Sequence, residues 1–124
     1  MWQANVTINN NTDYHITIAG DGPGDGNVNP NGTTQWSSTE VHNTKSLNFW
    51  MEEEPVHMQG NLSFGPEAGV YVDRGWMAAD DQTVKMTAVV PGKTWTQTSN
   101  GGEEILAWNE FTDGGDITLT FDKQ

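Results

Sequence analysis

Several reactive side chains stand close enough together in the sequence to suggest catalysis. Glu54 precedes His57 by three residues, the helical spacing that presents two ligands to a di-iron centre. Pro55 lies between them, however, and a second copy of the motif is missing, so a solvated acidic loop is favoured. Ser63 lacks the glycine two positions before it that a nucleophile elbow requires. The sequence therefore gives no support for acyl transfer.

Two pairs of adjacent carboxylates, Asp80 with Asp81 and Glu103 with Glu104, resemble the acid pairs of glycosidases. Glycoside hydrolysis needs two carboxylates that flank one bond. Adjacent residues of a strand point to opposite faces, so each pair is better explained as a charged, solvated strand edge. We therefore expect that the protein is not an enzyme.

The turn-rich stretch Gly20–Thr34 has asparagines at alternate positions, which imitates the start of a calcium-binding loop. Calcium prefers several ionised carboxylates, and this stretch supplies only Asp21 and Asp25. We expect a connecting loop here, with no metal and no other cofactor.

Composition limits the partners of the chain. Its 124 residues fit one domain, 1–124, and 17 acidic against five basic residues give a net charge of −12. This charge opposes binding to nucleic acid and simple adsorption to anionic lipid. Cysteine is absent, which excludes disulfides and thiol chemistry. The N-terminal "MWQANVTINN" lacks the basic and apolar regions of a signal peptide, so we expect a cytoplasmic protein or one released by a non-classical route.

The hydrophobic pattern has a period of two almost throughout. "ANVTI" and "YHITI" alternate around the turn cluster "NNNTD" and predict a hairpin, and "TVKMTAVV", "PGK" and "TWTQT" predict a second one. "DITLTF" alternates in the same way, and "LNFWM", "NLSF" and "VYV" are shorter strands. "EEILAWNEF" is the one segment that could also form a helix, and we expect it to be a strand. The sequence thus predicts an all-β fold, an antiparallel β-sandwich of about eight or nine short strands.

The six tryptophans are the least ordinary feature of this polar chain. Trp50 and Trp108 stand in apolar strands and are expected in the core. Trp36 and Trp76 stand among glycine, serine and aspartate in sequence typical of loops. Amphipathic aromatic residues at loop tips suit sugar faces or the membrane interface, and they also serve as plugs at the end of a core.

"YVDRGW", Tyr71–Trp76, resembles an aromatic and acidic segment of the aegerolysins, a family of small acidic β-sandwich proteins of fungi and bacteria. "WQANVTI", "GNLSFG", "KTWTQTSNGG" and "GGDITLTFDK" follow in the order expected for that family, and the resemblance spans most of the chain. Val72, Arg74 and Gly75 stand where the family has tryptophan, cysteine and proline.

The resemblance implies binding to particular membrane lipids, and some aegerolysins target a larger pore-forming partner protein to cytolytic or insecticidal effect. It places Tyr71, Asp73, Trp76 and Trp95 at the membrane-facing end. Because the net charge opposes anionic surfaces, the lipid should have a neutral or zwitterionic headgroup. Tyr71 and Trp76 would then insert, while Asp73 and Arg74 hold the headgroup by charge-assisted hydrogen bonds.

Two other functions fit the same residues. In a lectin-like module, Trp36 and Trp76 would stack on sugar rings while asparagine and aspartate side chains bind the hydroxyl groups. In a structural or insecticidal β-protein without a ligand, all the tryptophans would belong to the core. The sequence leaves these alternatives open.

Overall fold

The computed structural model describes residues 3–24, 26–39, 43–53, 56–65, 69–78, 84–98, 102–108 and 114–123, and for 71–78, 93, 95–98 and 102–108 the description covers the backbone only. Every regular element in these residues is a strand, and none of them forms a helix long and apolar enough to cross a membrane. The strands are β1 (Gln3–Asn11), β2 (Ile16–Gly20), β3 (Asn27–Val28), β4 (Thr33–Thr39), β5 (Lys45–Glu53), β6 (Val56–Gly65), β7 (Gly69–Ala78), β8 (Val84–Val90), β9 (Lys93–Thr98), β10 (Gly102–Trp108) and β11 (Gly114–Lys123).

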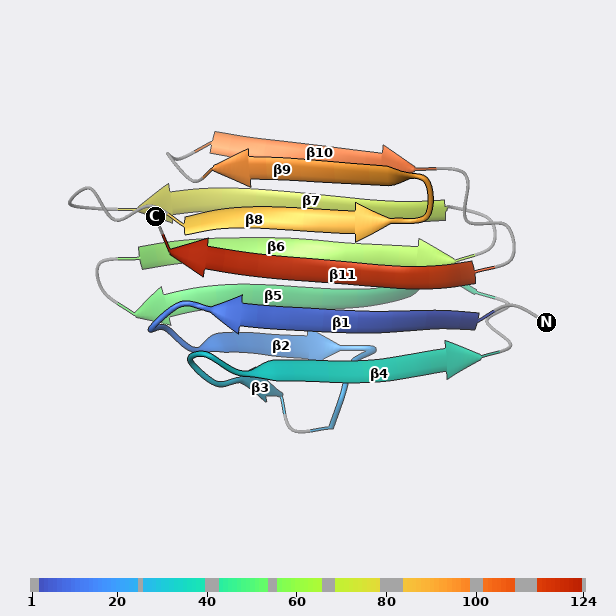
Figure 1. Ribbon diagram of the computed structural model, residues 1–124, viewed down its shortest axis with the longest axis horizontal. Helices are drawn as coiled ribbons and strands as arrows, with labels where there is room; N and C mark the ends of the chain where they lie inside the picture. The colour runs from blue at the N-terminus through green and yellow to red at the C-terminus, as the bar shows by residue number, and fades with distance from the viewer. Residues whose placement is uncertain are drawn as a thin grey trace.

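The strands form two sheets packed face to face (Figure 1). The five-stranded sheet has the order β4-β1-β11-β8-β9, and the six-stranded sheet has the order β10-β7-β6-β5-β2-β3. Alternate residues of β1, β8 and β11 are buried between the sheets, as their period of two predicts. Phe49 of β5 and Phe121 of β11 meet edge to face across the core, with ring centroids 5.7 Å apart. The predicted all-β sandwich is confirmed, with one departure from the expected antiparallel arrangement, because β1 and β11 pair in parallel.

One of the two predicted hairpins is wrong. β8 and β9 do pair antiparallel around the turn at Pro91 and Gly92. β1 and β2, in contrast, belong to different sheets, because β1 pairs with β4 and β11 while β2 pairs with β3 and β5. The "NNNTD" segment therefore carries the chain from one sheet to the other.

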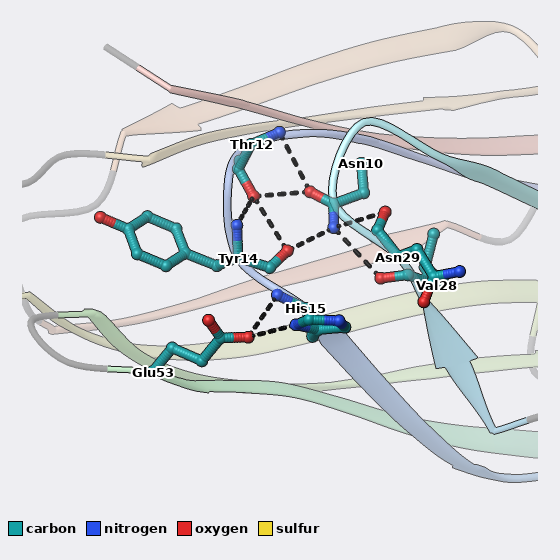
Figure 2. Close-up of polar contacts among 7 residues, drawn as sticks. All are labelled: Asn10, Thr12, Tyr14, His15, Val28, Asn29 and Glu53. Atoms are coloured by element: carbon teal, nitrogen blue, oxygen red, sulfur yellow. Dashed lines mark hydrogen bonds and ion pairs between the residues drawn. The ribbon is translucent and has the colours of Figure 1, made fainter.

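A buried asparagine holds this crossing in place (Figure 2). Asn10 is fully buried, and its Nδ2 donates to the carbonyl oxygens of Tyr14 at 2.6 Å and of Val28 and Asn29 at 3.2 Å. Its Oδ1 accepts from the backbone N–H of Thr12 at 3.1 Å and from the Thr12 hydroxyl at 2.6 Å. One side chain thus satisfies polar groups of the β1–β2 crossing, of the last residue of β3 and of the residue after it.

At the surface of the same crossing, Glu53 binds His15. The Glu53 carboxylate accepts hydrogen bonds from the backbone N–H of His15, at 2.8 Å, and pairs with its ring Nδ1 (Figure 2). The backbone hydrogen bond and then the side-chain hydrogen bond lower the pKa of Glu53 below its ordinary value of 4.5. Both side chains remain exposed, so the pair orients the start of β2 rather than stabilising the core.

Two strands were not expected, and with them the described residues contain eleven strands instead of about eight or nine. They are β3, within the turn-rich stretch Gly20–Thr34, and β4, which begins at the end of that stretch. A turn precedes β4. In this turn the N–H of Gly32 donates to the carbonyl oxygen of Asn29 at 2.9 Å, and Asn31 has a φ of 60°. The expectation that Trp36 and Trp76 lie in loops is therefore wrong, because Trp36 belongs to β4 and Trp76 to β7.

The expectation that Trp50 belongs to the core is also corrected. Its neighbours Phe49 and Met51 are buried, and Trp50, between them on β5, faces the other side of the sheet and is only partly buried. The period of two assigns only alternate residues of "LNFWM" to the core. The side chain of Trp108 lies outside the described part.

Candidate functional site

Strands from both ends of the chain and from its middle meet in the five-stranded sheet. β1 pairs in parallel with β11 and antiparallel with β4. Gly114, where β11 begins, has a φ of 84°, and a Cβ there would lie 1.8 Å from the carbonyl oxygen of Gln3. Glycine at this position therefore lets the start of β11 approach β1 closely.

The outward faces of these strands are polar, and their side chains form rungs across the sheet. In the first rung, Asn5 Nδ2 donates to Asp116 Oδ1 at 3.0 Å. The Ser37 hydroxyl and the Gln3 amide donate to Asn5 Oδ1 at 2.8 and 3.0 Å. Asn5 thereby joins β4, β1 and β11 through side chains as well as through the backbone.

A second rung repeats this arrangement four residues further along β1. Asn9 Nδ2 donates to the Thr120 hydroxyl at 3.3 Å, and Asn9 Oδ1 accepts from the Thr33 hydroxyl at 3.0 Å. Beyond it, Asn11 Nδ2 donates to Asp122 at 2.9 Å. The outward asparagines of β1 thus use their hydrogen-bonding groups mainly on their neighbours within the sheet.

The row between the two rungs is different. Gln35, Thr7 and Thr118 stand side by side on β4, β1 and β11, because Thr7 pairs with Gln35 on one side and with Thr118 on the other. Within the part of the chain that the structure describes, their side chains have no hydrogen-bond partner. One amide and two hydroxyl groups are therefore available, in one row, for a ligand.

This row lines an open groove of about 470 Å³. Asn5, Ser37 and Asp116 of the first rung line it beside Thr7, Gln35 and Thr118. Val6 and Trp36 also border it, although their side chains pack in or against the core. Asp116 is the one charged residue of this lining, and only its Oδ1 is used by Asn5. The groove combines amide and hydroxyl donors with one carboxylate acceptor, a set that suits the hydroxyl groups of a neutral ligand.

Comparisons with known proteins do not identify the ligand of this groove. Comparison with protein-family models, with curated proteins and with solved structures finds no match to this chain. The resemblance to the aegerolysins therefore stays a prediction, and function is argued from the chemistry of the site.

The backbone of β7 places the segment on which the lipid prediction depends. β7 lies between β6 and β10 in the six-stranded sheet, away from the groove. Its register sets Tyr71 opposite Ser63 and Asp73 opposite Asn61. The side chains of Tyr71 and Trp76 lie outside the described part of the chain, so their predicted insertion into a membrane stays a prediction.

The other two predicted site residues lie in the other sheet. Trp36 belongs to β4 and Trp95 to β9, the opposite edges of the five-stranded sheet. Trp36 packs against the core beside Val6, and its Nε1 is buried without a partner among the described residues. Trp36 therefore borders the groove by its position on β4 while its indole faces the core, which does not fit the predicted stacking of Trp36 on a sugar ring. By backbone position the six predicted residues are spread over three strands: Trp36 on β4, Trp95 on β9, and Tyr71, Asp73, Arg74 and Trp76 on β7.

The residues that the sequence suggested for catalysis lie on different strands or outside the described part of the chain. Ser63 lies on β6, where its hydroxyl donates to Asn61 Oδ1 at 2.7 Å and approaches Ser46. Glu103 and Glu104 are neighbours on β10 and have opposite parity in the strand. Glu54 and the pair Asp80 and Asp81 lie outside the described residues.

Proposed function

We propose that the protein is a glycan-binding module without catalytic activity, and that it binds a neutral saccharide in the groove on β4, β1 and β11. The observation that supports this most is the unpartnered row of Thr7, Gln35 and Thr118 between two rungs whose groups are already bonded. A sugar ring presents hydroxyl groups that both donate and accept hydrogen bonds, and the two hydroxyl groups and the amide of this row also do both.

Charge and exposure set the kind of saccharide and the strength of binding. The net charge of −12 and the carboxylate of Asp116 oppose acidic sugars, so the ligand is neutral. The groove is open and polar, so much of the hydrogen-bond energy offsets the loss of water. We expect a dissociation constant on the order of 0.1–1 mM, about −4 to −5.5 kcal/mol.

The lining also supports binding over hydrolysis. Glycoside hydrolysis requires two carboxyl groups on either side of the scissile bond, about 5–9.5 Å apart. Within the described residues the groove is lined by one carboxylate, that of Asp116. A bound sugar is therefore held and released unchanged.

A second candidate function is binding to a neutral or zwitterionic membrane lipid, with or without a larger pore-forming partner protein, as the resemblance implies. The backbone of β7 places Tyr71, Asp73, Arg74 and Trp76 on one strand of the six-stranded sheet. Tyr71 and Asp73 have the same parity and stand opposite Ser63 and Asn61, whose side chains are outward and partly exposed. In this proposal Tyr71 and Trp76 insert into the membrane, and Asp73 and Arg74 hold the headgroup by charge-assisted hydrogen bonds.

Parallel binding assays separate the two functions. The protein is tested against an array of neutral and acidic glycans and, by sedimentation, against vesicles of zwitterionic phospholipid with and without sphingolipid. We expect binding to neutral glycans and no retention on vesicles. Retention on zwitterionic vesicles with no glycan signal would reject the first proposal in favour of the second, and failure of both assays would reject both.

A further inference from the structure

The exposed edges of the two sheets differ in how they are protected. Natural sheets guard their edges with charged residues, proline or very short strands. β3 consists of Asn27–Val28 alone, β9 begins with Lys93, and β10 contains Glu103 and Glu104. β4, with the seven residues Thr33–Thr39, contains no charged residue, proline or glycine. Among the edge strands of the described residues, β4 is the one that its sequence leaves open to pairing.

The backbone of β4 has hydrogen-bonding groups available on its outer side. Asn10 N–H donates to the carbonyl oxygen of Gly32 at 2.8 Å, and the same register continues to Val6 opposite Trp36. Hydrogen-bonded residues alternate along an antiparallel pair, so the even-numbered residues of β4 direct their N–H and C=O groups towards β1. The odd-numbered residues direct theirs away from the sheet, and these are Thr33, Gln35, Ser37 and Thr39.

The sequence of β4 is nearly symmetric in residue type about Trp36, as "TTQ-W-SST" shows. Antiparallel pairing of two copies about Trp36 would set Thr33 opposite Thr39 and Gln35 opposite Ser37. The backbone N–H and C=O groups of these four residues point away from the sheet, so they could form the hydrogen bonds of the new pair. Hydroxyl and amide groups would face each other, and no two like charges would meet. We propose that β4 is the interface of a two-fold symmetric dimer, in which it pairs antiparallel with β4 of a second copy of this chain.

Pairing of β4 with a second copy would bury more of the Trp36 side chain. Trp36 would stand opposite Trp36 of the second copy in a non-hydrogen-bonded pair, where Cα atoms are about 4.5 Å apart. Its side chain is partly buried against the core in the single chain. Pairing brings two indoles together at the open edge of the sandwich and removes more of their surface from water.

The dimer would also join the two grooves, and this part of the inference depends on the proposed function. Gln35 and Ser37 line the groove of one copy and would lie directly beside Ser37 and Gln35 of the other. The free row of one copy would therefore continue into the first rung of the second copy. A linear neutral oligosaccharide long enough to cross the two-fold axis would contact both copies and bind more tightly than a monosaccharide.

Analytical ultracentrifugation of the full chain over a range of protein and salt concentrations tests the dimer. We expect a concentration-dependent species of twice the 13.6 kDa mass of the chain. Because each copy carries a charge of −12, screening by salt should strengthen association. A mass of one chain at every concentration and salt would overturn the inference. Glycan binding by such a monomer would leave the proposed function intact, so the two failures are distinguishable.

Charge exchange at positions 33 and 39 tests the register, since neither residue lines the groove. The variant with Thr33→Lys and Thr39→Lys sets like charges opposite each other at both ends of the interface, and it should be monomeric although its net charge is lower. The matched variant with Thr33→Lys and Thr39→Glu sets opposite charges together and should restore the dimer. Equal association of the two variants would contradict the antiparallel β4 pairing, and circular dichroism spectra like that of the original chain exclude misfolding as the cause of a monomer.

Discussion

Replacing Asn10 with alanine should lower the free energy of unfolding by about 3–5 kcal/mol. We expect this loss to be larger than that from any other single substitution of a polar residue in the described part of the chain. The fully buried side chain donates to the carbonyl oxygens of Tyr14, Val28 and Asn29 and accepts two hydrogen bonds from Thr12. Without it several buried groups have no partner, and each such group costs about 1–3 kcal/mol. Chemical denaturation followed by circular dichroism measures the loss.

Two further variants make this test specific. Asn11→Ala is the matched control, because Asn11 is exposed and donates a single hydrogen bond to Asp122. We expect it to change the free energy of unfolding by less than about 1 kcal/mol. Asn10→Asp has nearly the same shape but sets oxygen against three carbonyl oxygens, so it should be as destabilising as Asn10→Ala. Equal stability of the Asn10→Ala and Asn11→Ala proteins would contradict the role of Asn10 in the crossing.

Removing the free row of the groove should abolish glycan binding while the fold remains intact. The combined variant Thr7→Val, Gln35→Ala and Thr118→Val deletes three polar groups, each worth about 0.5–1.5 kcal/mol in a hydrogen bond. A loss of about 1.5–4.5 kcal/mol weakens binding by roughly tenfold to a thousandfold. These side chains have no partner within the described residues, so the melting temperature should hardly change. Isothermal titration with a neutral oligosaccharide measures the effect.

Thr94→Val provides the control for this experiment. Thr94 is exposed on β9, and it stands opposite Val89, which in turn stands opposite Thr118. It therefore lies on the same outer face as the groove but does not line it. Binding by the Thr94→Val protein should equal that of the original chain. An equal loss in the control and in the combined variant would show that a general change of the surface, and not the groove, weakens binding.

The sequence predicts the fold where one face of a strand is apolar and the other polar. "TVKMTAVV" and "DITLTF" show this alternation clearly, and both became strands with the expected residues buried. β4 was missed because its inward positions hold Thr34, Trp36 and Ser38, so a single apolar residue marks the buried face. The crossing after β1 was read as a hairpin because Asn10 stands between two other asparagines, and pattern alone does not distinguish a buried asparagine from a turn residue.

The candidate site was harder to predict than the fold. Asn5 and Asp116 bond to each other from positions 111 residues apart, and no local pattern indicates that the first and last strands pair in parallel. A signal was present in the outward residues of β1 and β11, which are nearly all asparagine, threonine or aspartate. The tryptophans are the more conspicuous feature of the sequence, and they favour Trp76 and Tyr71, whose side chains lie outside the described residues.

The central claim is that a neutral saccharide binds on the outer face of β4, β1 and β11. The most direct test of this claim is to follow amide chemical shifts during a titration with a neutral oligosaccharide. Heteronuclear NMR spectra of the labelled protein would report each backbone amide and the side-chain amides of Asn5 and Gln35. The proposal predicts shifts that saturate at millimolar ligand and concentrate at 5–7, 35–37 and 116–118, with little change on β5 and β6. Shifts confined to β7, or spectra that do not change at the highest saccharide concentration, would contradict it.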